Sequence, residues 1–199
     1  MITIGITGGV GAGKSEILKF LEKTYDGKVL KADEIAHFLE KKGQSCYNKL
    51  VLAFGNQILA EDGEIDKAAF AKVIFSEEKN LNLVNSIVHP EVKKYILQTI
   101  EEERERGSQF LFLEAALLLE DGYDQILDEI WYIYASESTR AERLRKSRGY
   151  SDEKIAEILK NQLSEEEFRK KCKFVIDNNS SVAEATAQIA NYVRCHFGN

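Results

Sequence analysis

Apolar residues recur along this chain in two spacings that alternate. Short apolar runs, which predict strands, lie at residues 2–7, 28–32, 109–113, 130–134 and 174–176. Between the runs apolar residues follow a helical spacing, as Ile17, Leu18 and Leu21 do after the first run. Strands that alternate with helices predict an α/β fold with a parallel sheet.

The longest stretch without a strand lies between the second and third runs. Residues 35–107 are mainly helical in pattern, with helices expected over 34–42 and 45–54. Asp66 is the expected N-cap of a further helix, and Pro90 suits the first turn of a long helix that ends near residue 106. This insertion is far longer than an ordinary crossover and predicts a subdomain for a second substrate.

A glycine-rich segment, residues 8–15, follows the first strand. It has the pattern Gly, four residues, Gly-Lys-Ser. Its glycines let backbone N–H groups form a nest for phosphate oxygens, and the helix that follows adds a partial positive charge. Lys14 can reach the β- and γ-phosphates, and the Ser15 hydroxyl can ligate Mg²⁺. A glycine-rich turn without a ligand would leave the Lys and Ser spacing to coincidence, so we predict a nucleoside triphosphate site.

Composition limits the cellular compartment and the class of partner that the protein can have. The 199 residues carry a net charge of −6 and three cysteines, and no apolar run is long enough to span a bilayer. Cys46, Cys172 and Cys195 lie far apart, with neither metal-ligand spacing nor a disulfide framework, as in reduced cytosolic proteins. The first strand begins at once, which leaves no room for a signal peptide. We therefore expect a cytoplasmic protein that has neither a membrane nor a nucleic-acid duplex as its main partner.

An acidic residue near the end of the second predicted strand helps to distinguish a kinase from other nucleotide-binding proteins. Asp33 follows that strand directly, and ligands collect at the carboxyl edge of a parallel sheet. A carboxylate there can accept the proton of an attacking hydroxyl, which favours a kinase, although Asp33 could instead cap a helix. No Asn-Lys-x-Asp motif follows a later strand, which counts against a GTP-dependent switch.

Further matches along the chain add a family resemblance. They comprise residues 4–15, 31–37, Phe54-Gly55, Asp62-Gly63, His89-Pro90, 117–120, Gln162 and 175–179. In this order and spacing the chain resembles the dephospho-CoA kinase family. No single later match is specific, but their order and spacing together are.

The resemblance implies a phosphate-loop NTPase fold of three layers, with a five-stranded parallel sheet. It divides the chain into a nucleotide-binding core of residues 1–34, 108–136 and 166–199, a helical acceptor subdomain of residues 35–107, and a helical lid of residues 137–165. The implied reaction transfers the γ-phosphoryl group of ATP, with Mg²⁺, to the ribose 3′-hydroxyl of dephospho-CoA. This reaction is the last step of coenzyme A synthesis.

The resemblance also implies roles for single residues. Asp33 is the expected general base, and Lys14 and the lid residue Arg143 are expected to act in catalysis. Nucleotide contacts are expected from Gly9, Val10, Gly11, Ala12, Gly13, Lys14, Ser15, Glu16, Arg140, Arg148 and Asn178. Acceptor contacts are expected from Thr7, Asp33, His89, Leu117 and Glu120. Ser15 and Glu114 are the expected Mg²⁺ ligands.

Several of these side chains have a structural alternative. His89 could pack in a loop before a helix, and Glu114 could be a carboxylate satisfied at the sheet edge. Asn178 could form a turn, and the leucines at 117–119 could belong to the core. Each lid arginine could be merely exposed, as most arginines are.

The chain departs from the family pattern at four places. Glu16 stands where Thr is usual, Ala116 where Pro is usual, and Glu114 where Asp is usual. In the lid, Ser147 replaces an expected arginine and Arg148 follows, so the lid arginine is shifted by one position. A carboxylate at position 16 must turn away from a bound α-phosphate.

Two rival functions stay open on the residues alone. One is a kinase of the same fold that acts on a nucleoside, a nucleotide or another hydroxylated metabolite. The other is a regulatory ATPase without a small-molecule acceptor, against which Asp33 and the helical insertion count. The preference for ATP over GTP is undecided, and we expect a monomer or a weak homo-oligomer.

Overall fold

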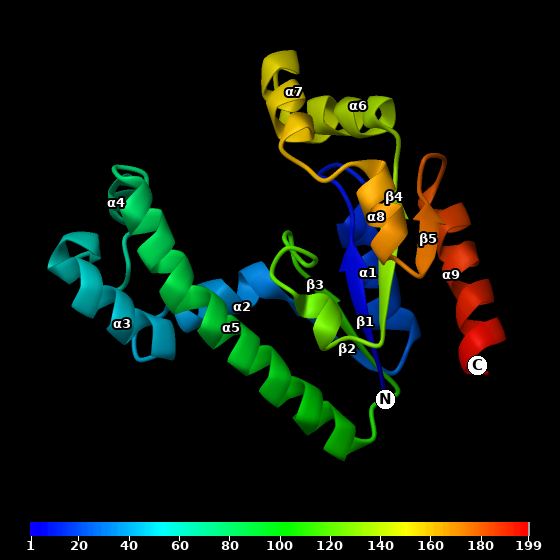
Figure 1. The fold of residues 1–199 in the computed structure, drawn as a ribbon, viewed down its shortest axis with the longest axis horizontal. Coiled ribbons are helices and arrows are strands. Elements are labelled where there is room, and N and C mark those ends of the chain that lie inside the picture. The colour runs from blue at the N-terminus through cyan, green and yellow to red at the C-terminus, as the bar shows by residue number, and fades with distance from the viewer. Residues whose placement is uncertain (199) are drawn as a thin grey trace. The chain divides into compact units, whose positions relative to one another are not determined.

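The structure is a computed structural model that describes residues 1–198 (Figure 1). In chain order the elements are β1 (Ile2–Thr7), α1 (Lys14–Thr24), β2 (Gly27–Lys31), α2 (Ala32–Leu39), α3 (Ser45–Phe54), η1 (Gly55–Ile58), α4 (Lys67–Ile74), α5 (Glu78–Arg106), β3 (Phe110–Glu114), η2 (Tyr123–Gln125), β4 (Glu129–Tyr134), α6 (Glu137–Arg148), α7 (Asp152–Lys160), α8 (Glu165–Lys171), β5 (Phe174–Asp177) and α9 (Val182–Phe197).

Within residues 1–198, five strands form one sheet in the order β2-β3-β1-β4-β5. β1 pairs in parallel with β3 and with β4, and β4 pairs in parallel with β5. Because parallel strands share a carboxyl edge, the segments that follow β1 and β3 leave the sheet on the same side. The predicted fold class, an α/β fold on a parallel sheet, is confirmed.

One face of the sheet is covered by α1 and α9. Ile4 and Ile6 of β1 pack in one buried cluster with Ile17 and Leu21 of α1 and with Ile189 of α9. In α1 these apolar residues recur at helical spacing, so the helix turns one stripe toward the sheet. This burial anchors β1, the strand that leads into the glycine-rich segment.

The other face of the sheet is packed as closely. Tyr132 of β4 stacks on Phe168 of α8, with ring centroids 4.7 Å apart. On β1, a β-carbon at Gly5 would lie only 2.8 Å from Leu127 Cδ1 and 3.0 Å from Leu118 Cδ1. Helices and loops therefore press on both faces, which explains why the strands are apolar on both sides.

The chain divides into two compact units. One comprises residues 1–29 together with the chain from residue 107 onward, and the other is Leu30–Arg106. The second unit is formed by α2, α3, η1, α4 and α5. Its long helix α5 contacts α2, α3 and α4 through a buried stripe in which apolar residues recur every four positions: Val84, Val88, Val92, Ile96 and Ile100.

Pro90 does not begin a helix. The expectation that a separate helix starts there is wrong, because α5 runs unbroken from Glu78 to Arg106 with Pro90 inside it. An interior proline costs a helix about 3 kcal/mol. Burial of each large apolar side chain of the α5 stripe returns about 1.5–3 kcal/mol, so tertiary packing outweighs the local penalty.

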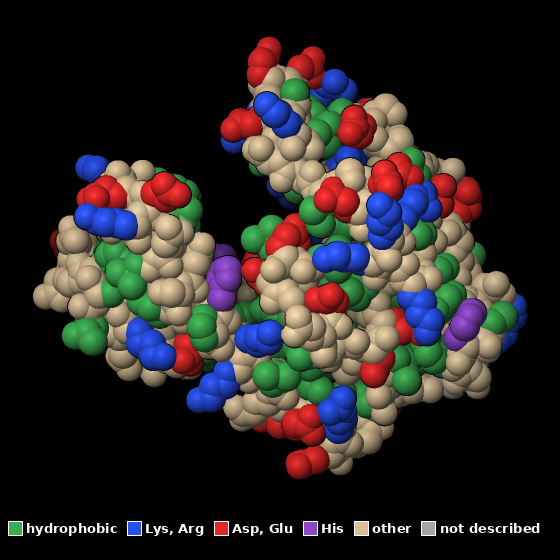
Figure 2. Space-filling model, in the orientation of Figure 1, with side chains coloured by type: hydrophobic (Ala, Val, Ile, Leu, Met, Phe, Trp, Pro, Cys, Tyr) green, Lys and Arg blue, Asp and Glu red, His purple; other side chains and the backbone are tan. Residues whose placement is uncertain are grey.

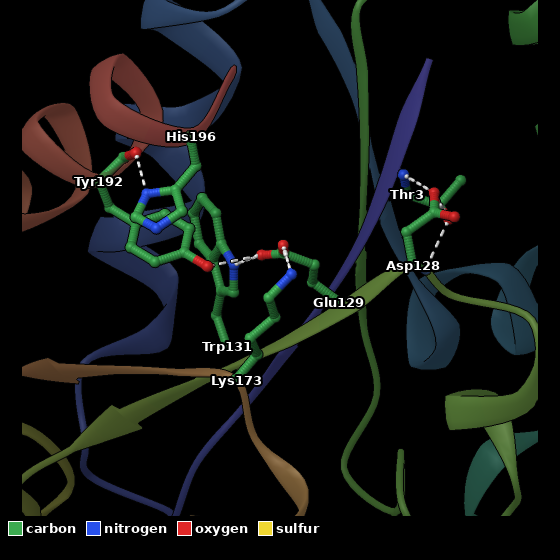
Figure 3. A network of polar contacts seen from close by, with 7 residues as sticks. All are labelled: Thr3, Asp128, Glu129, Trp131, Lys173, Tyr192 and His196. Atoms are coloured by element: carbon green, nitrogen blue, oxygen red, sulfur yellow. Dashed lines mark hydrogen bonds and ion pairs between the residues drawn. The ribbon is translucent and has the colours of Figure 1, made fainter. Parts of the chain in front are cut away.

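A buried carboxylate ties β4 and β5 to α9 (Figure 3). Glu129 Oε2 accepts hydrogen bonds from Trp131 Nε1 and from the Tyr192 hydroxyl, both at 3.0 Å, and Glu129 Oε1 pairs with Lys173 Nζ. The His196 ring stacks on Tyr192 with centroids 4.0 Å apart. Glu129 opens β4 and Lys173 directly precedes β5, so the network lies at the amino edge of the sheet. It is at the edge opposite the glycine-rich segment and supports the fold.

No helix among residues 1–198 combines the length and the apolar character that a membrane span needs. On the face drawn in Figure 2, Lys and Arg side chains lie beside Asp and Glu side chains over both units. Neither sign of charge dominates that face, in keeping with 27 basic and 33 acidic residues in the chain.

Candidate functional site: a phosphate loop under a basic helix

The glycine-rich segment forms an open loop between β1 and α1. Gly13 is the N-cap of α1 and has φ +90°, a left-handed conformation that side chains rarely adopt. A β-carbon at Gly13 would also collide with Asn178 Nδ2. Among residues 1–198 no side chain caps the first turn of α1, so its N–H groups, which point toward the loop, stay available to an anion. These features make the loop an anion site.

Lys14 and Glu114 bring opposite charges together beside the loop. Lys14 Nζ donates to the Gly8 carbonyl at 2.7 Å and lies 3.8 Å from Glu114 Oε1. Glu114 ends β3 and is paired in register with Ile6 of β1, which places its carboxylate at the carboxyl edge of the sheet. Both side chains are about one-sixth exposed, at 17% and 16%. The ammonium group is thus held over the loop by one carbonyl and one carboxylate.

The Ala12 carbonyl is held from outside the loop by two donors. Asn178 Nδ2 donates to it at 2.7 Å and Arg143 Nη1 at 3.4 Å, while Arg143 Nη2 donates to the Asn178 carbonyl at 2.7 Å. Asn178 follows β5 and is only 1% exposed. In a trans peptide, the carbonyl of one residue and the N–H of the next point in opposite directions. Holding the Ala12 oxygen outward therefore directs the Gly13 N–H into the loop.

The helix α6 lies against the same loop through Arg140. Its Nη1 donates to Gln162 Oε1 at 2.6 Å, and a β-carbon at Gly9 would collide with this nitrogen. Arg140 Nε is buried without a hydrogen-bond partner among residues 1–198. A buried unpaired donor costs about 1–3 kcal/mol, which an anionic oxygen would recover. A cavity of about 310 Å³ adjoins Arg140 and Gln162.

Two further residues that are expected to contact the nucleotide, Glu16 and Arg148, interact with neighbours close in sequence. The Glu16 carboxylate accepts from Lys19 Nζ at 2.8 Å on the exposed side of α1, so it is turned toward its own helix. Arg148 ends α6, with its guanidinium 5.8 Å from the centre of the Tyr150 ring. The structure brings Arg140 and Arg143 to the loop and leaves Arg148 at the end of the helix.

Comparison with known proteins decides the family. The family model for dephospho-CoA kinase matches residues 2–184. The chain belongs to the dephospho-CoA kinase family. A dephospho-CoA kinase of Carboxydothermus hydrogenoformans is 36% identical over 186 residues, covering 94% of this chain and 90% of that protein. The dephospho-CoA kinase of Dehalococcoides mccartyi is 33% identical over 180 residues, which cover 90% of this chain and 89% of that protein.

Solved structures share the fold of this chain. A crystal structure from Thermus thermophilus superposes with a TM-score of 0.82 at 27% identity, covering 100% of this chain and 98% of that one. Dephospho-CoA kinase from Campylobacter jejuni superposes with a TM-score of 0.74 at 23% identity, covering 99% of this chain and 98% of that one, and this likeness concerns the fold. Shikimate kinase from Acinetobacter baumannii gives 0.52 at 13% identity, with 100% and 95% covered, and this likeness concerns the fold alone.

The residues expected to meet the acceptor fall in both units of this kinase-family chain. Thr7 ends β1 and is 3% exposed, whereas Leu117 after β3 is 49% exposed. Leu118 and Leu119 are buried, so for these two leucines the core alternative is correct. Glu120 is exposed.

Asp33 and His89 belong to the helical unit. α2 begins at Ala32 with Lys31 as its N-cap residue and no side-chain cap, so the alternative that Asp33 caps the helix is wrong. Asp33 lies instead in the first turn, where the helix dipole favours a carboxylate. His89 is an exposed residue inside α5, so the loop alternative for it is wrong as well.

Sequence reasoning missed how this family site is held. No spacing rule links Asn178 with Ala12, which are brought together only when β5 and the loop meet at the sheet edge. The turn after β5 is made by Asp177, whose Oδ1 accepts from the Asn179 N–H at 2.9 Å, so the Asn178 side chain is not the turn former. His37 Nδ1 lies 2.6 Å from the Asp33 carbonyl, a contact that helical i, i+4 spacing could have suggested.

Proposed function

We propose that the chain transfers the γ-phosphoryl group of ATP to the ribose 3′-hydroxyl of dephospho-CoA, giving coenzyme A and ADP. The observation that carries the proposal is the family match over residues 2–184, which begins at a strand leading into a built phosphate loop. In such transfers the protein supplies mainly position and charge balance. The residues described above supply both.

Each step of the proposed reaction has a residue of this chain. The Asp33 carboxylate takes the proton of the 3′-hydroxyl as that oxygen attacks the γ-phosphorus. Lys14 and the N–H groups of the loop balance the charge of the transferring group, because both are held at the loop by the bonds described above. Arg140 and Arg143, both on α6, bind phosphate oxygens of ATP. Asn178, whose carbonyl accepts from Arg143, also contacts the nucleotide.

Oxygen donors beside the loop fit a magnesium ion. Ser15, in the first turn of α1, offers a hydroxyl, and Glu114 offers a carboxylate 3.8 Å from Lys14 Nζ. Mg²⁺ prefers oxygen ligands and is commonly held by one or two carboxylates together with substrate phosphates. We propose that Ser15 and Glu114 hold this ion, which when bound would neutralise phosphate charge.

The proposal extends to the setting of the reaction. His89, Leu117, Glu120 and Thr7 are proposed to contact the acceptor, and α7 with its flanking turns to close over ATP so that water cannot compete as acceptor. The net charge of −6 supports a small-molecule partner over a polyanion. We propose a cytoplasmic enzyme that is a monomer or a weak homo-oligomer.

Product identification and one matched pair of variants test the proposal. The wild type, incubated with ATP, Mg²⁺ and dephospho-CoA, should yield coenzyme A by mass spectrometry. Asp33→Asn should lower kcat by about 10²–10⁴-fold, the usual contribution of a general base, and leave the Kd of ATP within about threefold. Glu34→Gln is the control, since Glu34 shares the first turn of α2 and pairs with Lys31 at 2.7 Å on the exposed side of the helix. Unchanged turnover in Asp33→Asn would exclude Asp33 as the base.

A further inference from the structure

Gln162 lies beside the phosphate loop, in the short connection between α7 and α8. Its Oε1 accepts a hydrogen bond from Arg140 Nη1 at 2.6 Å. A β-carbon at Gly9 would collide with that Arg140 nitrogen and would lie only 2.8 Å from Gln162 Oε1. The φ of Gly9 is not positive, so its backbone conformation does not require a glycine. The missing side chain instead leaves space for the Arg140–Gln162 pair.

The pair lies at the end of the loop where Lys14 is held. A lysine of this motif reaches the β- and γ-phosphates of a bound nucleotide, and Lys14 Nζ is fixed over the start of the loop by a 2.7 Å bond to a carbonyl. The Arg140 guanidinium lies against Gly9, in the same part of the loop. Arg143 instead contacts the Ala12 carbonyl at 3.4 Å, next to the N-terminus of α1. The two arginines of α6 therefore contact opposite ends of the loop.

The backbone that carries Gln162 is held on both sides. Its N–H donates to the Leu159 carbonyl at 3.4 Å in the last turn of α7. Two residues further on, Ser164 begins α8 with a capping box, and Phe168 of α8 stacks on Tyr132 of the sheet with ring centroids 4.7 Å apart. A side chain with such support can keep a partner in one orientation.

The bond to Gln162 sets the direction of the Arg140 guanidinium. This group is planar, with five N–H donors and no acceptor, so it can bond the Gln162 amide only at Oε1. Once Nη1 is held, the remaining donors point in fixed directions. Arg140 Nε is buried without a hydrogen-bond partner among residues 1–198, so a phosphate oxygen that reaches it replaces no existing bond. Donors that are already oriented stabilise developing charge without reorganising during the reaction.

We propose that Gln162 is the positioning residue for Arg140 and holds its guanidinium at the γ-phosphoryl end of the nucleotide, where it stabilises the transferring group. The inference rests on the proposed function, because it takes ATP as the phosphoryl donor. It also divides the work of α6, since Arg140 acts on the γ-phosphoryl group and Arg143 acts at the other end of the loop.

Single variants, a double variant and a matched control test the inference. Gln162→Met removes the acceptor at similar side-chain length, Arg140→Ala removes the guanidinium, and the double variant combines them. The control is Asn161→Ala, because Asn161 is the exposed residue that ends α7 directly before Gln162. Measurements are kcat, the Kd of ATP and of ADP by calorimetric titration, and turnover with added guanidinium chloride. Circular dichroism checks that each variant is folded.

We expect Arg140→Ala to lower kcat about 10²-fold or more, as the loss of one donor to a transition-state charge does. Gln162→Met should lower kcat about tenfold or more, because it removes a hydrogen bond to a charged group. The double variant should be as slow as Arg140→Ala alone, since Gln162 acts through Arg140. Added guanidinium should restore part of the turnover of Arg140→Ala and less of that of the double variant, which lacks the amide that holds the ion. Asn161→Ala should match the wild type.

Three results would overturn the inference. One is a double variant in which the two losses multiply, and another is equal recovery with guanidinium whether or not Gln162 is present. The third is tighter ATP binding in Gln162→Met with unchanged kcat, which would mean that Gln162 holds Arg140 away from the nucleotide. If the wild type makes no coenzyme A, the proposed function fails, but the titrations still locate Arg140. Both single variants should then weaken ATP more than ADP, and equal weakening would contradict a position at the γ-phosphate.

Discussion

Removing the Asn178 amide should disorganise the phosphate loop without touching the phosphates. Asn178→Ala deletes the 2.7 Å bond to the Ala12 carbonyl and leaves that oxygen, within residues 1–198, with the 3.4 Å contact from Arg143. A buried carbonyl without a good partner costs about 1–3 kcal/mol. The substitution also removes Asn178 Oδ1, which is buried without a partner among residues 1–198, and so recovers part of that cost. A net loss of about 1–2 kcal/mol remains.

That loss should appear as weaker nucleotide binding. With the carbonyl released, the Ala12–Gly13 peptide can rotate, and the apparent Kd rises as the fraction of competent loop falls. A loss of 1–2 kcal/mol corresponds to an increase of about 5- to 30-fold in the Kd of ATP. Calorimetric titration of the wild type and the variant with ATP, and separately with GTP, measures this increase.

The comparison of the two nucleotides separates loop positioning from base recognition. If Asn178 acts on the loop, ATP and GTP weaken by the same factor, because both carry the same triphosphate. Asn179→Ala is the control, since this neighbouring Asn accepts a hydrogen bond from Ser136 N at 2.8 Å and, among residues 1–198, makes no hydrogen bond with the loop. Its Kd for ATP should stay near that of the wild type. A selective loss of ATP in Asn178→Ala, or no loss at all, would refute the positioning argument.

Two further predictions concern titratable groups. Burial raises the pKa of Glu129, but the bonds from Lys173, Trp131 and Tyr192 outweigh it and hold this pKa below its ordinary value. The ionised carboxylate therefore stabilises the fold above its unfolded-state pKa, and the contribution is lost as the pH falls through the lower folded-state pKa. Glu129→Gln should lower the free energy of unfolding by about 1–3 kcal/mol at pH 7, with the gap closing in acid, and a gap that widens in acid would contradict this. Burial raises the pKa of Cys46 to about 11 and that of Cys172 to about 12, so iodoacetamide at pH 8 should label exposed Cys195 first in the native chain; mass spectrometry of the labelled peptides checks this order.

Local patterns predicted the sheet and the phosphate loop because their causes are local. Consecutive apolar residues predict a strand covered on both faces, and Gly13-Lys14-Ser15 carries its own conformational requirement in the left-handed glycine. The helix boundary at Pro90 was missed for a different reason. A proline is a local signal, whereas the stripe through Val88 and Val92 gains its free energy from α2, α3 and α4, which the sequence does not place.

The distinction between local and long-range causes applies to the candidate site as well. Lys14 could be named from the glycine-rich motif and Glu114 from its position at a strand end, but their 3.8 Å pairing depends on the register between β1 and β3. The Glu16 carboxylate, which must turn away from any bound α-phosphate, pairs with Lys19 three residues along its own helix, a contact that i, i+3 spacing makes accessible to prediction.

The contacts of α6 limit where a lid can move. Arg140 and Arg143 are one turn apart and contact the loop at Gly9 and Ala12, and Leu144 beside them is 1% exposed. A displacement of α6 would thus break the Arg143 bonds to the Ala12 and Asn178 carbonyls and draw Arg140 away from the loop, which would weaken the anion site. Gly149 ends α6 in a left-handed conformation, and in residues 1–198 no atom lies within 4 Å of the place a β-carbon would take. We infer that α6 moves with the nucleotide-binding core and that any closure over ATP is confined to the segment after Gly149.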